Sequence, residues 1–495
     1  MRSSCRYPST PLCGGLYGAL AVAFCASAGW AAPDIGFGSI EGLGVVAREG
    51  TYPDGASALS MMTTACNVGA ENISWLAPMS EDHPAVVMQL YRMSDGRFEQ
   101  VGISAARHEY FALSNSECGT CQVQSNGTFL GAGCSTTSGV GINADRNLLG
   151  PRGEIDPYSG AWTCSGSLFA GGQSDCVARP HDGDGPLDRR LVVTDADLDV
   201  PGASFVYEAY WVTAGDADRR NSVGSRSANV IRVGSNFIVS DVNDEAVGAA
   251  LERWGGTQTW VSLPGDGELL LASKSWDLGG GLYQYEYALF NLDSARKVGA
   301  VRIPVGSSTV SDIGFHDPDS DPATDWVSGV SGGEISWSTD SFDVDPEAPA
   351  LSYGLLYNFR FVSDQPPAEG TATLVAFEGG EDEVAVAAVV PEGSTTSVSE
   401  FATESTFGLT CRPMPMQASG EISFRLENSA SVSLAVFDAS GRLLRALHEG
   451  TAPAGENVVR WDGTDASGRS VAPGVYFVRL RGVQGEETAR ISVVR

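Results

Sequence analysis

"GLYQYEYALFNLD" (Gly281–Asp293) alternates aromatic and polar side chains from Tyr283 to Tyr287 and continues with apolar residues. A repeat of two residues places successive side chains on opposite faces of a β-strand. The stretch begins at a glycine and ends in Asn-Leu-Asp, which are residue types typical of turns. This combination predicts a β-strand that is bounded by turns.

The same pattern recurs along most of the chain, and segments with the period of a helix are nearly absent. Two of the strand-like segments flank Ser94-Asp95-Gly96, which predicts a hairpin because Gly96 can take the positive φ that the turn requires. Between Ser114 and Arg190 the pattern gives way to a Gly-, Ser- and Cys-rich stretch that is typical of long loops. We therefore predict an all-β chain whose body is a β-sandwich with disulfide-pinned loops.

The charge of the chain limits its partners. The 495 residues carry a formal charge of −30, with 61 acidic and 31 basic residues. A protein that binds nucleic acid needs a concentrated basic face, and no run of more than two Lys or Arg residues occurs here. Nucleic acid is therefore not expected as a partner, and an anionic membrane surface is disfavoured by the same repulsion. The length predicts two or more domains.

The N-terminus has the pattern of a targeting segment. Arg2 and Arg6 precede the apolar stretch "GGLYGALAVAFCASA", in which Ala26 and Ala28 have the small-residue spacing of a signal-peptidase site. We predict a signal peptide at residues 1–28. No later stretch is long and apolar enough for a spanning helix, so no transmembrane segment is expected after cleavage, and the protein is expected to be secreted or on the cell surface.

Cysteine usage is consistent with export. Six cysteines lie in the N-terminal region, an even number that predicts three disulfides without fixing which of the fifteen pairings forms. They are Cys66, Cys118, Cys121, Cys134, Cys164 and Cys176. The alternatives for "CGTC" at 118–121 are a redox pair or half of a zinc site. Cys411 is left over, either free or paired between chains.

The C-terminal part contains "SVSLAVFDASGRLLRALHEG" followed by "AGENVVRWDGTDASGRSVAPGVYFVRL". It resembles the immunoglobulin-like module of the flagellar hook-capping protein and the C-terminal sorting domains of type IX secretion cargo. The resemblance implies a small immunoglobulin-like β-sandwich that serves in sorting, attachment or spacing. Stretches of the body, among them "LGPRGEIDPYSG" and "IGFHD", are similar to large secreted proteins of environmental bacteria, and that resemblance implies no activity.

These observations divide the chain into five regions. They are a signal peptide at 1–28, a Cys-containing β-rich region at 29–228, a β-sandwich region at 229–392, a linker at 393–412 and an immunoglobulin-like sorting or attachment domain at 413–495. The regions 29–228 and 229–392 form either two domains or one body.

An acidic loop is the first candidate metal site. Its carboxylates, Asp317, Asp319, Asp321 and Asp325, occupy relative positions 1, 3, 5 and 9, which resembles the order of ligands in Asp-rich calcium loops. The loop lacks the glycine and the glutamate of an EF-hand, and two prolines stiffen it. The alternative is a solvated loop between two strands.

A transition-metal site is the second candidate. His83, His108 and His316 come from separate strand-like segments, and three imidazoles can bind copper or zinc with an open position. Asp317 would then orient the imidazole of His316. Calcium is the favoured metal, and copper or zinc is the alternative.

Together these features predict an exported extracellular or cell-surface protein that acts as a ligand-binding, adhesive or structural module displayed through its C-terminal domain. Its expected partners are an extracellular ligand and the cell-surface or secretion machinery. The competing hypothesis is a secreted metal-dependent enzyme, either an oxidoreductase or a hydrolase, built on the three histidines.

Overall fold

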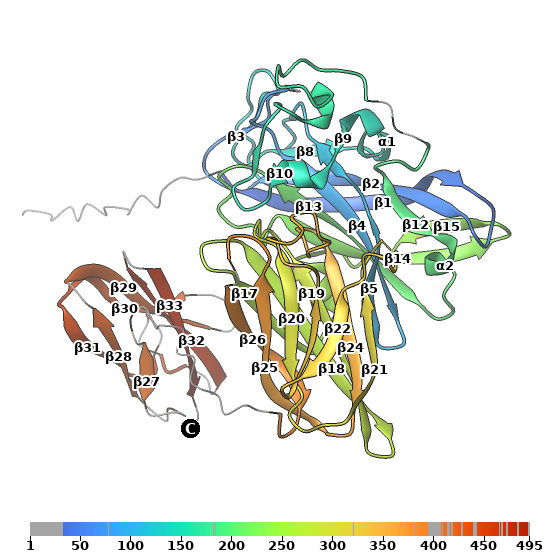
Figure 1. Cartoon of the computed structure of the whole chain (residues 1–495). Coiled ribbons are helices and arrows are strands. Elements are labelled where there is room, and N and C mark those ends of the chain that lie inside the picture. The colour runs from blue at the N-terminus through green and yellow to red at the C-terminus, as the bar shows by residue number, and fades with distance from the viewer. Residues whose placement is uncertain are drawn as a thin grey trace, which may run out of the picture. The chain divides into compact units, whose positions relative to one another are not determined.

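The computed structural model describes most of the chain after residue 32. The described residues are 33–394 except 78, 182, 184, 320 and 381, and then 407, 409–412, 416, 419–426, 429–438, 443–464, 466, 469–471, 474–482 and 485–493. The predicted signal peptide and most of the predicted linker lie outside these residues. The chain divides into two compact units, residues 1–395 and 396–495 (Figure 1).

The first half of unit 1 is built on one large antiparallel sheet. Its main path consists of β1 (Ile35–Glu49), β2 (Ala56–Asn67), β12 (Leu191–Thr194), β5 (Arg97–Ile103), β4 (Ala85–Ser94), β13 (Ser204–Val212), β14 (Val223–Val233) and β15 (Asn236–Asp241), in that order. The shorter strands β6 (Ala106–His108), β8 (Ser135–Ser138), β9 (Leu149–Gly150) and β16 (Ala246–Val247) pair beside this path. The two end strands of this path contact each other, and the backbone N–H groups of Gly42 and Leu43 in β1 donate to the carboxylate of Asp241 in β15.

The predicted hairpin at residues 94–96 is confirmed. Strands β4 and β5 pair in antiparallel register from Ser94–Arg97 outward, and Asp95 and Gly96 both have positive φ, 51° and 84°. A side chain at residue 96 would also approach the indole of Trp276 to 3.0 Å, so glycine is required for space as well as for conformation.

The loop-rich segment between β6 and β12 contains only short elements among the described residues. They are β7 (Phe129–Leu130), which pairs with β3 (Ile73–Ser74), the strands β8 and β9, β10 (Ile155–Asp156), which pairs with β11 (Ala161–Trp162), the helix α1 (Val140–Asn143), and the 3-10 turns η1 (Arg146–Leu148), η2 (Arg152–Glu154) and η3 (Leu168–Ala170). This agrees with the predicted long loops. The short helix α2 (Asp195–Leu198) follows directly after β12.

The three predicted disulfides are confirmed, and the structure supplies their pairing. Cys66 is bonded to Cys118, Cys121 to Cys134, and Cys164 to Cys176. Cys118 and Cys121 therefore have different partners, so "CGTC" is neither a redox pair nor half of a zinc site. The bonds secure loops that contain little regular hydrogen bonding of their own.

The second half of unit 1 is a β-sandwich. One sheet has the order β17 (Thr257–Ser262), β18 (Glu268–Gly279), β19 (Leu282–Asn291), β24 (Leu356–Ser363) and β21 (Val310–His316); the other has the order β22 (Val327–Ser331), β23 (Glu334–Ser338), β20 (Val298–Pro304), β25 (Pro367–Ala376) and β26 (Glu383–Pro391). The turn η4 (Ala250–Trp254) precedes it. Trp337 and Phe359 from opposite sheets meet in its core with ring centroids 5.4 Å apart.

Strand β19, which lies within the alternating stretch Gly281–Asp293, is buried on both faces. Tyr285 and Tyr287 pack into the core of the sandwich. Ala288 and Phe290, on the opposite face, belong to a second core that also contains Tyr210 of β13. Both halves of unit 1 therefore share one apolar core, and they form a single body.

Polar contacts reinforce this junction. The side chain of Gln100 in β5 donates to the carbonyl of Gly354 and accepts from the backbone N–H of Leu356. Asn358 of β24 donates to the carbonyl of Phe98 at 2.8 Å. Figure 1 shows β5 running beside β24 and β21.

Unit 2 is a small two-sheet structure, as the sequence predicts. The sheets have the orders β27 (Thr410–Arg412), β28 (Gly420–Leu426), β31 (Gly455–Trp461) and β30 (Leu443–Ala452), β29 (Ala430–Asp438), β32 (Gly474–Gly482), β33 (Gly485–Val493). Phe407 and Leu409 are buried in its core with Trp461. The unit therefore begins before residue 413, because these two apolar side chains of the predicted linker pack into the sandwich.

Candidate binding site

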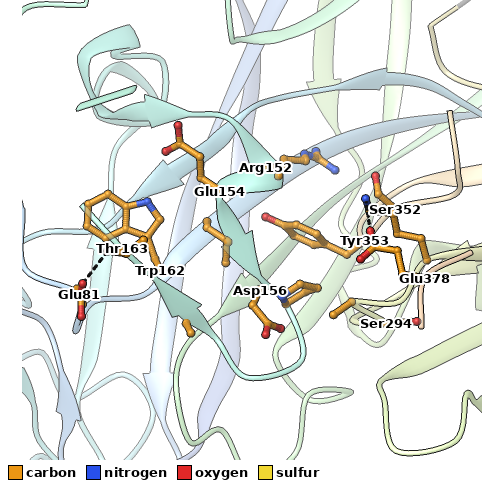
Figure 2. Close-up of a pocket in the computed structure, with 16 residues that line it drawn as sticks. Glu81, Arg152, Glu154, Asp156, Trp162, Thr163, Ser294, Ser352, Tyr353 and Glu378 are labelled. Atoms are coloured by element: carbon orange, nitrogen blue, oxygen red, sulfur yellow. Dashed lines mark hydrogen bonds and ion pairs between the residues drawn. The ribbon is translucent and has the colours of Figure 1, made fainter. Parts of the chain in front are cut away.

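A pocket of about 600 Å³ lies at the junction of the two halves of unit 1. One wall is the chain from η2 to β11, and the other is formed by loops of the sandwich (Figure 2). The charged, polar and aromatic residues that line it are Glu81, Arg152, Glu154, Asp156, Trp162, Thr163, Ser294, Lys297, Ser352, Tyr353 and Glu378.

The wall that carries Trp162 is held by local geometry. Asp156 accepts hydrogen bonds from the backbone N–H groups of Tyr158 and Ser159 and so shapes the turn between β10 and β11. Gly160 in this turn has a φ of 70°, and a side chain there would come within 2.3 Å of the backbone of Thr213. The Cys164–Cys176 disulfide follows directly. Trp162 is therefore placed by a rigid hairpin.

Three buried polar atoms at the pocket lack a hydrogen-bond partner among the described residues. They are Nε1 of Trp162, the hydroxyl oxygen of Tyr353 and Oε2 of Glu154. Trp162 and Tyr353 are 6% and 4% exposed. Burial raises the pKa of Tyr353, so its hydroxyl remains a hydrogen-bond donor. Buried polar groups without partners are rare and destabilising, so a ligand or water that bonded to these atoms would stabilise the protein.

Acidic side chains outnumber basic ones around the pocket. Glu81 accepts a hydrogen bond from the hydroxyl of Thr163 at 2.8 Å, and Glu378 pairs with Lys297 at 2.7 Å (Figure 2). Asp156 and Glu154 contribute two further carboxylates. The pocket thus combines two donors, the indole and the phenol, with several acceptors, which suits a small polar molecule that both accepts and donates hydrogen bonds.

Arg152 has a different role, because its guanidinium group is engaged by the protein itself. It donates to the backbone carbonyls of Ser104, Gly354 and Met88 at 2.6, 3.1 and 3.3 Å. The buried carboxylate of Glu208 lies close enough to influence it, and burial raises the pKa of Glu208 to about 7. Arg152 therefore joins the two halves of unit 1 beneath the pocket.

Two of the three predicted metal-binding histidines meet behind Trp162. Nε2 of His83 lies 2.8 Å from Nδ1 of His108, and both rings pack against the indole of Trp162 with centroids 5.2 and 5.0 Å away. Burial lowers the pKa of His83 to about 4. Burial, with the nearby His83 and Arg107, holds the pKa of His108 well below its ordinary value. Both imidazoles are therefore neutral at pH 7.

His316 does not join this pair. Nε2 of His316 contacts the carbonyl of Gln100, and Gln100 lies opposite Tyr91 of β4. His108, in contrast, lies opposite Ala85 of the same strand. At the usual rise of a strand, these positions are about 20 Å apart along β4. The three-histidine site with Asp317 as a supporting residue is therefore not formed, because the junction holds His316 at the far end of the strand.

The histidine pair predicts how stability depends on pH. The unfolded imidazole of His83 binds a proton near pH 6.5, whereas the folded one stays neutral down to about pH 4. The unfolded state therefore gains protons first as the pH falls, and stability is lost. Relative to a His83→Gln variant, the wild type should lose about 1–2 kcal/mol between pH 8 and pH 5. Urea unfolding of both proteins between pH 8 and pH 5 measures this loss. If the free energies of unfolding of the two proteins change with pH in parallel, the prediction is wrong.

The acidic loop connects the two sheets of the sandwich. Asp317 is buried, and its pKa is raised to about 7 by burial and by the carboxylates of Asp319 and Asp325. Asp321 is exposed, and its carboxylate accepts from the N–H of Ala323. Within the described part of the chain, no three His, Cys, Asp or Glu side chains are grouped as a metal site. Calcium binding by all four aspartates stays a prediction.

Sequence reasoning did not single out the pocket. Arg152, Glu154 and Asp156 lie in "LGPRGEIDPYSG", a stretch noted only for its resemblance to other secreted proteins. Tyr353 lies about 200 residues further along the chain, and nothing in its local sequence connects it with Trp162. Only the fold brings the two aromatic side chains together.

Comparison with known proteins identifies one part of the chain. Residues 414–486 match the FlgD Ig-like domain. The predicted resemblance of the C-terminal region is thus confirmed, and unit 2 contains a FlgD Ig-like domain. No curated protein matches the chain.

Solved structures give only distant likenesses. Dimeric latent PorU from Porphyromonas gingivalis is 11% identical with a TM-score of 0.16, over 94% of this chain and 34% of PorU. PorZ, a surface component of the type IX secretion system of the same organism, is 15% identical with a TM-score of 0.15, over 60% of this chain and 38% of PorZ. The adhesin domain of Epf from Streptococcus pyogenes is 9% identical with a TM-score of 0.13, over 46% of this chain and 78% of the adhesin domain. The chain thus spans little more than a third of PorU and PorZ, and scores of this size carry no argument about function.

None of the helices in the described part of the chain has the length and apolarity that crossing a membrane requires.

Proposed function

We propose that the chain is an exported protein of the cell surface or extracellular space that binds a small polar ligand in the pocket between Trp162 and Tyr353. In this proposal the FlgD Ig-like domain is the sorting or attachment module. The observation that carries it is the pair of buried, unpartnered donors, Nε1 of Trp162 and the hydroxyl of Tyr353, at a pocket of about 600 Å³. A ligand that accepts these two hydrogen bonds would remove the penalty of leaving them unmade.

Export is supported by the three disulfides, which persist in oxidising compartments. The Cys164–Cys176 bond, together with the shared core of unit 1, gives the pocket a rigid wall. A rigid site loses little entropy when a ligand binds, which favours a binding protein. The alternative of a metal-dependent enzyme required a metal site made by three histidines, and His316 lies apart from His83 and His108.

A Tyr353→Phe variant tests the role of the unpartnered hydroxyl. The change removes one oxygen and keeps the packing, so the free energy of unfolding should stay within about 0.5 kcal/mol of the wild type or rise. The matched control is Tyr287→Phe, because the Tyr287 hydroxyl donates to the carbonyl of Val389 at 2.6 Å. The free energy of unfolding of the Tyr287→Phe control should fall by about 1 kcal/mol. Urea unfolding of the three proteins measures both effects.

Ligand binding is measured on the same variants with a panel of neutral mono- and oligosaccharides and small amines, by thermal shift and calorimetry. A compound that binds the wild type should bind Tyr353→Phe and Trp162→Phe roughly 5–10-fold more weakly and the Tyr287→Phe control equally well. If Tyr353→Phe destabilises the protein as much as the control does, the hydroxyl has a structural partner and the proposal loses its basis. Equal affinity for all four proteins would also overturn it.

A further inference from the structure

Aromatic side chains pack together at the two ends of the acidic loop. Phe315, at the end of β21, stacks on Trp326, which precedes β22, with centroids 5.8 Å apart and an interplanar angle of 12°. The ring of Tyr357 in β24 meets Trp326 edge-on at 5.4 Å, and Nε1 of Trp326 donates to the carbonyl of Pro349. Both ends of the loop are therefore fixed in the core of the sandwich before any ligand binds, which lowers the entropy lost on binding.

Inside this loop one carboxylate is buried without compensation. Asp317 is 2% exposed, and its Oδ2 has no hydrogen-bond partner among the described residues. The side chain of Asp319 contacts that of Asp317, and the charge of Asp325 also acts on it, so the neighbouring charges that act on this carboxylate are negative. A buried charge beside like charges is strongly unfavourable unless the carboxylate takes up a proton or a cation is bound.

Other oxygen atoms of the loop lie beside the carboxylate of Asp319. The hydroxyl of Thr324 lies 3.1 and 3.0 Å from the two carboxylate oxygens of Asp319 and 2.7 Å from the carbonyl oxygen of Asp321. Nitrogen and sulfur ligands are absent from this stretch apart from His316, whose Nε2 is directed to Gln100. A set of oxygen donors in an irregular loop suits calcium, which accepts carboxylate, carbonyl, hydroxyl and water oxygens in flexible geometry.

We propose that this loop binds one calcium ion through the carboxylates of Asp317 and Asp319, with loop oxygens and water completing its coordination. Calcium does not require three acidic side chains, since backbone carbonyls and water supply the remaining ligands in many sites. The ion would secure the connection between the two sheets of the sandwich. The site is separate from the pocket at Trp162 and does not depend on the ligand proposed there.

The test compares melting temperatures of the full chain after treatment with EDTA, with and without 10 mM calcium chloride. With an affinity of about 10⁻⁴ M, typical of extracellular calcium sites, the wild type should melt roughly 2–5 °C higher with calcium. Asp317→Asn and Asp319→Asn should lose this shift. Asp343→Asn, which changes an exposed aspartate elsewhere in the sandwich, should keep it.

Sodium chloride at equal ionic strength controls for charge screening, and calorimetry of the EDTA-treated wild type measures binding directly. About one calcium ion per chain, absent in Asp317→Asn, would support the proposal. An unchanged wild-type melt without binding heat would overturn it, as would a calcium shift that persists in both Asp317→Asn and Asp319→Asn. Asp319 is exposed, so its variant keeps the test decisive if Asp317→Asn does not fold.

Discussion

Replacing both Cys66 and Cys118 with serine should lower the free energy of unfolding of unit 1 by about 4 kcal/mol. The bond closes a loop with a sequence separation of 52 residues, and opening it restores that chain entropy to the unfolded state. It also joins β2 of the large sheet to a loop that has few strands of its own. Urea unfolding measures the change.

The matched control is the double serine variant of Cys164 and Cys176, whose sequence separation is only 12 residues. The same relation gives a loss of about 3 kcal/mol for this bond. Removing the bond that closes the longer loop should therefore lower the free energy of unfolding more. If the two variants rank in the opposite order, local packing around the loops, and not loop entropy, determines what these bonds contribute.

Arg152→Met should be the most damaging single substitution at the junction. The change removes a donor to the carbonyls of Ser104 and Gly354 and a cation that interacts with the buried carboxylate of Glu208. Breaking a buried charged network by removing one member typically costs about 3–5 kcal/mol. Urea unfolding and limited proteolysis of the full chain measure the loss.

Arg302→Met is the control, because Arg302 pairs with Glu383 on the surface of the same unit, with side chains 36% and 50% exposed. An exposed pair contributes about 1 kcal/mol or less. Arg152→Lys should fall between the wild type and Arg152→Met, since lysine keeps the charge and loses the planar set of donors. Equal stability of Arg152→Met and Arg302→Met would show that the junction does not depend on this network.

Much of the fold follows from local sequence patterns. The alternation in Gly281–Asp293 and its counterparts predicted an all-β chain, and the structure confirms it. The turn at Asp95 and Gly96 was predictable because few residues tolerate positive φ. The C-terminal resemblance was equally local, since "FDASGR" and "WDG" lie within one small domain.

The candidate sites were less predictable. The three histidines share a residue type and occur in strand-like segments, yet only His83 and His108 meet. The acidic spacing of Asp317 and Asp319 was visible in the sequence, but the burial of Asp317 was not. The spacing of residues shows only which side chains are neighbours within one segment. Whether a side chain is buried depends on how distant segments of the chain pack against it.

Local sequence was enough to predict the all-β class, the turn at residue 96, the six cysteines that pair and the nature of the C-terminal domain, because each depends on neighbouring residues or on composition. Only the folded chain shows the disulfide pairing, the burial of both faces of β19 and the placement of Trp162 and Tyr353 at one pocket. These features require contacts between segments far apart in the chain. Such contacts are set by how whole sheets pack and bury apolar surface, which no local pattern encodes.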